Sequence, residues 1–322
     1  MGIEIKINLE LDKEWNKLIF YENQQSLFLS KKFLNYHPKD RFNEFNIFIF
    51  ENNKLFLIIP GVRNDEEIFS HNGSTYGGFI QFFPLSQEKY NQIYVELKNF
   101  LSNQGIKALS MRISPREFTK NTEYGFFDSL KDVETLYEEE ETFVELFNKN
   151  FINLRDSGFR RNHIRDIKKV IEIEDKLELK RSNLNDELHD YYKLLTNNLE
   201  KHNVEPTHSR EELKFLIENF KEQIWIDLLK FNGKIITGLV SFRMNKDVLH
   251  YFYGSTDYGF EPKGILKYAY WKSMINAKKN NFQYINFGVD SKFGEEHNKT
   301  LRSFKEGFGG KHTFRKTVKI KC

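Results

Sequence analysis

The distribution of apolar residues in the second half of the chain predicts an antiparallel sheet. The segments Trp225 to Phe231, Lys234 to Met244 and Val248 to Tyr253 are rich in β-branched and aromatic residues. They are separated by Asn232-Gly233 and by Asn245-Lys246. Asn-Gly favours a hairpin because a type I′ turn needs positive φ at both central positions. We therefore expect three consecutive antiparallel strands.

A helix and a further strand follow this sheet in the sequence. From Gly264 to Lys279 apolar residues recur at helical spacing, and Gln283 to Gly288 has the pattern of a strand. A strand, a helix and a strand form a crossover unit, so we expect Gln283 to Gly288 to lie parallel to Val248 to Tyr253. The helix opens on Pro262-Lys263-Gly264-Ile265. Its free N–H groups are suited to an anion such as the diphosphate of a nucleotide-type cofactor.

The first half repeats this order of elements. A hairpin, a strand, a helix and a strand are expected at Asn46 to Phe50, Lys54 to Pro60, Glu67 to Ser70, Gln87 to Asn103 and Lys107 to Ile113. Three helices are indicated between the halves, by the basic stripe Arg161 to Lys169, the apolar spacing from Leu188 to Leu199 and the capping box of Ser209 and Glu212. The pattern predicts an α/β fold with mixed sheets (α+β). We expect two domains, residues 1-150 and 151-322, packed together with connecting helices.

Composition supports a globular chain. With 322 residues, of which 39% are hydrophobic and 16% aromatic, the chain is long enough for two buried cores. Its 49 basic and 46 acidic residues give a net charge of +3, unlike a polybasic nucleic-acid binder. The chain has no secretory signal pattern and no membrane-length apolar window, so we expect a cytoplasmic protein without membrane insertion. The only cysteine, Cys322, excludes an internal disulfide and a multi-thiolate zinc site, and we expect no metal.

Short motifs along the chain point to a family. They are Tyr76-Gly77-Gly78, Arg112-Ile113-Ser114-Pro115, Phe159-Arg160-Arg161-Asn162-His163-Ile164-Arg165, Tyr253-Gly254-Ser255, Asn286-Phe287-Gly288 and Phe304-Lys305-Glu306-Gly307-Phe308-Gly309-Gly310. In this order they resemble the tandem-GNAT (FemAB-like) acyltransferase family. That family includes the Fem-type peptidoglycan aminoacyltransferases and shorter acyl-CoA-dependent relatives, some of which N-acylate nucleotide-linked amino sugars. The chain has no charged heptad insertion of the kind found in relatives that use aminoacyl-tRNA, which favours the shorter group.

The resemblance implies an N-acyltransferase with two GNAT-like halves. The second half would bind acyl-CoA, and the two halves would enclose an amine acceptor such as a nucleotide-linked amino sugar. The oxyanion is expected to meet a backbone N–H near Tyr253, where the parallel strands splay apart. The cofactor-binding residues are then expected to be Gly254, Ser255, Pro262, Lys263, Gly264, Ile265 and Lys305.

Two other functions stay open from the sequence. The first is a Fem-type aminoacyl-tRNA-dependent transferase acting on a peptidoglycan precursor, for which tRNA would be a partner. The second is a non-catalytic module that binds a sugar or a peptide. The sequence leaves the acyl chain, the acceptor and the oligomeric state undetermined.

Two residues are candidates for proton transfer. Asp290 follows the last strand of the crossover unit, where it is suited to act as general base or to bind the incoming ammonium. An Asx turn or an N-cap is the structural alternative. His71 stands at a strand end, where an imidazole with an unshifted pKa near 6.5 would accept the proton of the amine. A loop histidine bonded to backbone is the alternative there.

The remaining candidates are expected to bind substrate or phosphate. Tyr76 and Gly77 begin a loop in which glycines allow close approach to a ligand, or else serve a turn. Arg161 begins the basic stripe, which is suited to an anionic acceptor or to the adenosine 3′-phosphate, or else is plain surface. Lys305 is expected to reach a phosphate as a flexible point charge, or else to be a solvated helix lysine.

Overall fold

The computed structural model describes residues 2–17, 27–82, 85–119, 126–127, 130, 133–182, 185–201, 203–290 and 298–322. The chain divides into two compact units, which are unit 1 (Met1–Glu140 with Thr313–Cys322) and unit 2 (Glu141–His312). Strands β8 (Val133–Glu145) and β14 (Lys311–Lys321) both cross this division. The C-terminal segment, which the sequence analysis assigned to the second domain, therefore belongs to unit 1, because β14 pairs with a strand of that unit.

Unit 2 is built on one mixed sheet. The strand order is β8-β13-β12-β11-β10-β9. Strands β9 to β12 are antiparallel, whereas β12 and β13 are parallel. The three predicted antiparallel strands and the parallel crossover strand are thus confirmed. The bounds are β9 Leu177–Arg181, β10 Ile224–Phe231, β11 Lys234–Arg243, β12 Val248–Thr256 and β13 Tyr284–Val289.

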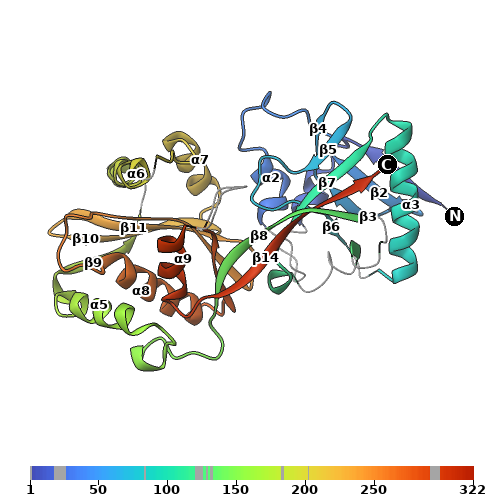
Figure 1. Ribbon diagram of the computed structural model, residues 1–322. Helices are drawn as coiled ribbons and strands as arrows, with labels where there is room; N and C mark the ends of the chain where they lie inside the picture. The colour runs from blue at the N-terminus through green and yellow to red at the C-terminus, as the bar shows by residue number, and fades with distance from the viewer. Residues whose placement is uncertain are drawn as a thin grey trace. The chain divides into compact units, whose positions relative to one another are not determined.

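Helices cover both faces of this sheet. In Figure 1, α6 (Asn185–Glu200) and α7 (Arg210–Asn219) lie on one face, and α5 (Arg161–Ile171) and α8 (Ile265–Lys279) lie on the other. The predicted capping box of Ser209 and Glu212 is present at the start of α7. The short helix α9 (Lys299–Glu306) precedes β14. The core on the α8 side includes Val144, Ile167, Met274, Ile285 and Phe308, all fully buried.

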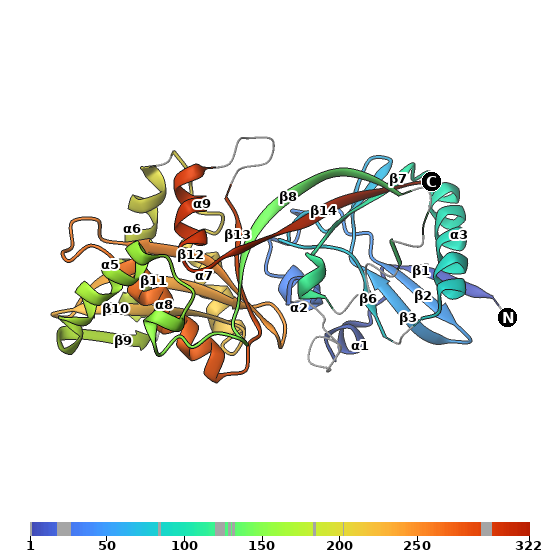
Figure 2. The same ribbon diagram turned by 60° about the horizontal axis from the view of Figure 1, so that its bottom comes forward.

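Unit 1 contains two sheets. The first, β1-β2-β3-β6, comprises Ile3–Ile7, Ile47–Glu51, Lys54–Ile59 and Ile80–Gln81. The second contains β4 (Val62–Asn64), β5 (Glu67–Ser70), β7 (Ala108–Ile113), β14 and β8 in that order. The longest helix of the unit, α3 (Gln87–Asn103), lies alongside β1 and β2 in Figure 2 and connects the parallel strands β5 and β7. The described part of unit 1 also contains α1 (Asp12–Lys17) and α2 (Lys31–Leu34).

The predicted repeat of element order is present, but the two halves use it differently. In unit 2 the antiparallel strands and the crossover strand share one sheet. In unit 1 the hairpin β2–β3 and the crossover pair β5–β7 belong to different sheets. The cause is local, since the short strand β4 follows β3 and pairs with β5, which begins a second sheet. Each unit has its own apolar core.

The long strands β8 and β14 carry complementary charges. Arg315 donates two hydrogen bonds to the carboxylate of Glu139, at 2.9 and 2.8 Å, with both side chains largely buried. Lys316 pairs with Glu138 at 2.7 Å. An acidic run in a strand is unfavourable by itself, so the basic partner strand stabilises β8. Among the helices of the described residues, none has the length and the apolarity needed to cross a membrane.

Candidate functional site

The parallel strands β12 and β13 of unit 2 separate partway along their length. Their pairing covers Val248 with Tyr284, Leu249 with Ile285 and His250 with Asn286. Beyond this point β12 continues to Thr256 and β13 to Val289. We call residues 251–256 and 287–289 the strand junction. The two strands therefore separate close to Tyr253-Gly254-Ser255, as expected from the sequence.

The backbone of β12 presents polar groups to this junction. The side chain of Asn198 in α6 bonds both backbone groups of Thr256, at 2.8 and 3.0 Å. The next residue, Asp257, donates its N–H to Ile236 of β11 at 2.7 Å. Backbone groups of successive strand residues point to opposite edges. Gly254 therefore directs its N–H to the same open edge as Thr256.

A β-bulge sets which side chains of β12 face each helix layer. Tyr251 and Tyr253 pair with adjacent residues of β11, so Phe252 is the extra residue. Past the bulge, a Cβ on Gly254 would lie 2.1 Å from the Tyr270 hydroxyl of α8. Glycine at this position thus makes room for that hydroxyl. Ser255, the next residue, is fully buried on the opposite face beside α6.

Tyr253 is fixed by the segment that leads into α7. Its hydroxyl accepts the backbone N–H of His208 at 3.2 Å, and its ring lies edge-on to the imidazole of the same histidine. Burial raises the pKa of the Tyr253 hydroxyl. The side chain is therefore a neutral, oriented group at neutral pH rather than a source of a phenolate.

Side chains form hydrogen bonds with the backbone groups at the end of β13. Lys305 of α9 is 4% exposed, and its Nζ donates to the carbonyls of Gly288 and Val289 at 2.9 and 2.6 Å. Asn286 accepts the N–H of Gly288 at 2.7 Å and donates to Glu141 at 2.9 Å. Lys305 is therefore neither the flexible phosphate ligand nor the solvated lysine expected from the sequence, because the backbone of β13 immobilises it.

Two carboxylates accompany the buried ammonium. Burial lowers the pKa of Lys305 to about 8, while the charges of Asp290 and Glu141 act in the opposite direction. Asp290 and Glu141 are themselves buried. The structure thus brings together Asp290 and Lys305, both singled out from the sequence. It adds Glu141, which could not be singled out from the sequence because it stands in a run of four glutamates.

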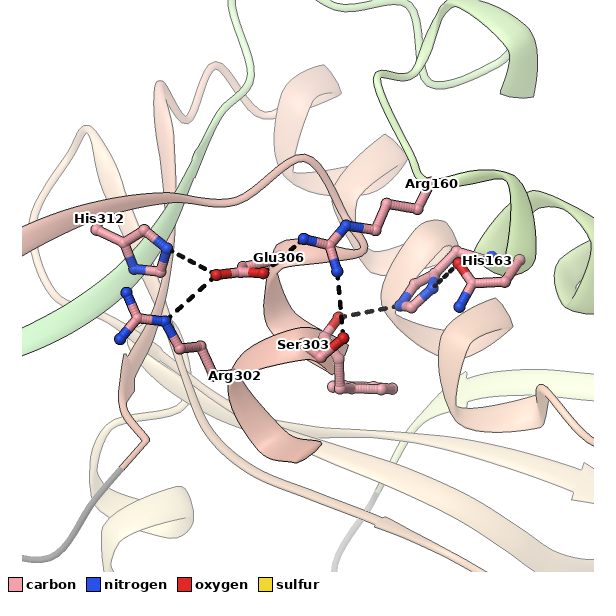
Figure 3. Close-up of polar contacts among 8 residues, drawn as sticks. Arg160, His163, Arg302, Ser303, Glu306 and His312 are labelled. Carbon is pink, nitrogen blue, oxygen red and sulfur yellow. Dashed lines mark hydrogen bonds and ion pairs between the residues drawn. The ribbon is translucent and has the colours of Figure 1, made fainter. Parts of the chain in front are cut away.

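The helix that carries Lys305 is clamped to the start of α5. Figure 3 shows Glu306 contacting Arg160, Arg302 and His312, at 2.5, 3.3 and 3.1 Å. Arg160 also donates to Ser303 at 3.2 Å. Although burial opposes it, hydrogen bonding to these partners holds the pKa of Glu306 below its usual value. The clamp fixes α9 and with it the position of Lys305.

Two of the sequence motifs pack against each other here. A Cβ on Gly307 would lie 2.0 Å from the His163 ring, and the Nε2–H of His163 donates to the Phe304 carbonyl at 3.0 Å. Burial lowers the pKa of His163 to about 4, so the ring is neutral. Gly307 of this motif therefore allows α9 to pack against α5. Arg161, the first residue of α5, is exposed.

The N-terminus of α8 is the expected diphosphate position. Gly264 is its N-cap with φ 110°, and Ile265 is buried. The N–H of Lys263 donates to the Glu261 carboxylate at 2.9 Å, and its Nζ donates to the Tyr258 carbonyl at 2.6 Å. An anionic group thus already occupies one N–H at this helix end. The residues Pro262 to Ile265 fit a phosphate once the exposed Glu261 side chain moves away.

In unit 1 the structure corrects the expectation for His71. Burial lowers the pKa of its imidazole to about 4, with a further contribution from the charge of His37. Its Nδ1 accepts the N–H of Gly73 at 3.0 Å. The unshifted pKa expected from the sequence is therefore wrong, and the ring is a weak proton acceptor at neutral pH.

Tyr76 and Gly77 occupy a tightly packed crossing in unit 1. Tyr76 is buried with its ring edge-on to Phe28. A Cβ on Gly77 would lie 1.5 Å from the carbonyl oxygen of Ser70. The Gly77 N–H donates to the backbone carbonyl of Arg112 at 2.6 Å. Close approach of the chain to itself explains this glycine.

Comparisons with known proteins agree with this architecture. Residues 157–300 match the family model described as an acetyltransferase (GNAT) domain. No curated protein matches the chain. Among solved structures, FemX superimposes with a TM-score of 0.71 at 11% identity, covering 98% of this chain and 97% of FemX.

Two further structures are similar over the full length. A conserved protein of unknown function from Bacteroides thetaiotaomicron has a TM-score of 0.63 at 12% identity, covering 99% of this chain and 100% of its own. A tandem GNAT protein from the clavulanic acid biosynthesis pathway has a TM-score of 0.51 at 6% identity, covering 99% and 98%. The chain therefore has a tandem GNAT-like fold with mixed α/β sheets.

The crossing at Gly77 yields a stability prediction. We expect Gly77→Ala to destabilise unit 1 by roughly 3 kcal/mol or more, because the added methyl group meets backbone that cannot move independently. Gly105→Ala is the control, since Gly105 has φ +70° but open space around it. It should cost only about 1–2 kcal/mol. Chemical denaturation measures both, and equal losses would contradict the packing explanation.

The buried ammonium yields a titration prediction. We expect the Cε resonance of Lys305 to titrate near pH 8 in NMR spectra, against an ordinary pKa of 10.5. Glu141→Gln should lower this pKa further, by roughly one unit, because a nearby carboxylate favours the charged form. Glu138→Gln on the same strand is the control and should leave it unchanged. If Lys305 stays protonated up to pH 10, the lowered pKa is contradicted.

The sign of the accompanying stability effect follows from the same shift. Between about pH 8 and 10.5 the unfolded chain binds the proton that folded Lys305 releases. The contribution of this group to the free energy of unfolding therefore rises with pH in that window.

Proposed function

We propose that the chain is an N-acyltransferase that transfers an acyl group from acyl-CoA to a primary amine. The observation that carries this proposal is the strand junction of unit 2, which lies within the stretch matching a GNAT domain. At this junction the N–H of Gly254 points to the edge of β12 beyond its pairing with β13, where no strand of the described residues pairs with it. A fixed N–H at such a place is suited to stabilise the oxyanion of acyl transfer.

The proposed reaction is a direct attack in a ternary complex. The amine lone pair forms the new C–N bond, and the thioester carbonyl becomes a tetrahedral oxyanion near the Gly254 N–H. Collapse of this intermediate breaks the C–S bond and releases the thiolate of CoA. The surplus proton of the amine passes to Asp290 and then to the thiolate. Holding the amine about 3 Å from the carbonyl supplies much of the rate enhancement.

Lys305 and Tyr253 support this chemistry from fixed positions. Lys305 places a positive charge next to Asp290 at the end of β13. A buried cation there stabilises negative charge that develops at the junction. Tyr253 lies on β12, and its neutral hydroxyl accepts the backbone N–H of His208. This hydrogen bond keeps the strand edge oriented.

The donor is proposed to place its diphosphate at the start of α8. The residues that would hold it are Lys263 and Gly264, with Lys169 of α5 close enough to affect the pKa of Glu261. Helix N-terminal N–H groups and cations together are suited to a diphosphate. CoA supplies the leaving thiolate. Ser255 and Ile265 are buried, so we propose that they shape the site rather than contact the diphosphate.

The acceptor is proposed to be the amino group of a nucleotide-linked amino sugar. Its support is the resemblance of the sequence motifs to the shorter acyl-CoA-dependent relatives. Exposed Arg161 at the start of α5 is the proposed contact for its phosphate groups. Tyr76 and Gly77 keep the fold of unit 1 in this proposal and do not touch the acceptor.

One observation favours a second donor class. The Glu261 carboxylate at the Lys263 N–H opposes a diphosphate until it moves. An aminoacyl-tRNA donor, as in the Fem-type alternative, needs no diphosphate at this helix end. The test of the proposal therefore includes both donors.

The central experiment is a screen of the full chain with acyl-CoA thioesters and nucleotide-linked amino sugars, read by mass spectrometry. We expect a new amide together with stoichiometric release of the CoA thiol. Asp290→Asn should lower kcat by roughly 100-fold, which is typical for loss of a proton-transfer group. His71→Ala, if it folds, should leave the pH profile unchanged.

The screen separates the proposal from its rivals. Amide formed only with charged tRNA, and abolished by ribonuclease, would establish the aminoacyl-tRNA reading instead. Binding of sugars without any product, unchanged by Asp290→Asn, would indicate a non-catalytic module.

The helix terminus gives a sharper test of the donor. We expect Glu261→Gln to tighten acyl-CoA binding about two- to fivefold, because removal of a competing negative charge near a helix N-terminus is worth a few tenths to one kcal/mol. Lys263→Gln should weaken it. Glu222→Gln, at an exposed glutamate before β10, is the control for net charge. Isothermal titration calorimetry measures all three, and an affinity insensitive to both Glu261 and Lys263 would place the diphosphate elsewhere.

A further inference from the structure

A second pocket lies in unit 2, between α8 and the outer strands of the sheet. It has a volume of about 240 Å³. Its lining residues come from β9, β10, β11 and residues 269–276 of α8. None of them belongs to the strand junction or to the start of α8. The pocket is therefore unaccounted for by the proposed acyl transfer.

The polar centre of this pocket is the carboxylate of Asp227. The sheet register aligns Asp227 with Arg181 on one side and Leu239 on the other. The indole N–H of Trp225 donates to Asp227 at 2.9 Å. Its nearest cation is Arg181, 3.8 Å away, whose guanidinium is stacked 4.3 Å from the Trp225 ring centre. The carboxylate thus has one neutral donor and one cation at ion-pair distance.

The other cations of the lining are engaged elsewhere. Lys180 pairs with Glu187 at 2.6 Å, and Lys272 pairs with Glu174 at 2.5 Å. The side chain of Asp227 is only 17% exposed. Burial raises the pKa of this carboxyl, and its contacts with Trp225 and Arg181 offset this effect only in part.

The wall opposite Asp227 offers further polar groups and apolar surface. Ser273 and Asn276 of α8 line it with a hydroxyl and an amide, beside Ala269. Leu179 and Leu239 form the apolar part. The hydroxyl of buried Tyr251 approaches Ser273 without completing a hydrogen bond. The charge of Asp227 contributes to raising the pKa of this hydroxyl, after burial. Each of these groups can accept a hydrogen bond as well as donate one, and they lie around a negatively charged centre.

This combination selects a ligand class. A primary ammonium carries three N–H donors and one positive charge, which match one carboxylate with a hydroxyl and an amide nearby. A divalent cation needs several oxygen ligands, whereas Asp227 is the only carboxylate in the lining. The leucines and Ala269 accommodate a short aliphatic body.

We propose that this pocket binds a small aliphatic primary amine, with its ammonium on Asp227 and its carbon chain against Leu179 and Leu239. The site is separate from the strand junction and holds whether or not the acyl transfer proposed above is correct. It adds a second small-molecule site to unit 2.

The experiment uses the full chain, labelled with ¹⁵N, and 3-methylbutylamine as the probe. Its neutral counterpart is 3-methylbutan-1-ol. We expect the amine, at roughly millimolar affinity for so few atoms, to shift the indole N–H resonance of Trp225. The indoles of Trp15 and Trp271 donate to the carbonyls of Leu29 and Phe151 and serve as internal controls. The alcohol should bind at least about tenfold more weakly.

Matched variants decide the role of the carboxylate. Asp227→Asn keeps an acceptor for Trp225 and should weaken amine binding about tenfold or more. Glu178→Gln removes the same charge from an exposed residue of β9 outside the lining and should leave binding unchanged. Asn276→Trp, at an exposed position of α8, should obstruct the mouth of the pocket and abolish binding.

The outcomes are unambiguous. Equal binding of amine and alcohol, equal effects of Asp227→Asn and Glu178→Gln, or retained affinity in Asn276→Trp would each overturn the proposal. If Asp227→Asn does not fold, the Asn276→Trp variant still decides it. A shift confined to Trp225 and lost in Asn276→Trp establishes the site.

Discussion

The Lys305 ammonium bonds the carbonyls of Gly288 and Val289, at the end of β13 beyond its pairing with β12. Carbonyls left without partners in a buried place cost free energy, and a neighbouring strand is the usual remedy. Here a lysine supplies the donors for two carbonyls at the end of β13. On the opposite edge, the side chain of Asn198 does the same for Thr256. The junction is thus a stable open edge because side chains replace the missing ladder.

The same constraint explains why the motifs around the junction contain glycines. Gly254 makes room for the Tyr270 hydroxyl and Gly307 makes room for the His163 ring. Both contacts hold helices against the sheet, and α9 must be held if Lys305 is to reach β13. Glu306, with Arg160, Arg302 and His312, completes this support. Of these motif residues, Gly307 and Glu306 hold α9, the helix that carries Lys305.

The local sequence pattern was sufficient to predict helices, strands and hairpins. It was insufficient to predict which strands pair when they lie far apart in the sequence. The hairpin at Asn232-Gly233, the crossover helix α8 and the capping box at Ser209 each rest on neighbouring residues, and each is confirmed. Strand β8 carries Glu138 to Glu141, a composition that opposes a strand by itself. Its partner β14 neutralises it from far along the chain, and the pairing of β14 with β7 places the C-terminal segment in unit 1. Burial, which sequence does not reveal, decided the expectations for His71 and Lys305.

Glu141 shows why a site of this kind exceeds what spacing can reveal. Its neighbours Glu138 and Glu139 pair with β14, whereas Glu141 faces Asn286 and the buried ammonium. Alternation places Glu139 and Glu141 on the same face of the strand, yet Glu139 pairs with Arg315 of β14 and Glu141 bonds Asn286 of β13, so spacing alone does not tell them apart. An ammonium taken out of water needs nearby negative charge to stay protonated at neutral pH. Asp290 and Glu141 supply it from two strands, so that the open edge, the cation and its counter-charges form one preorganised unit before any ligand arrives.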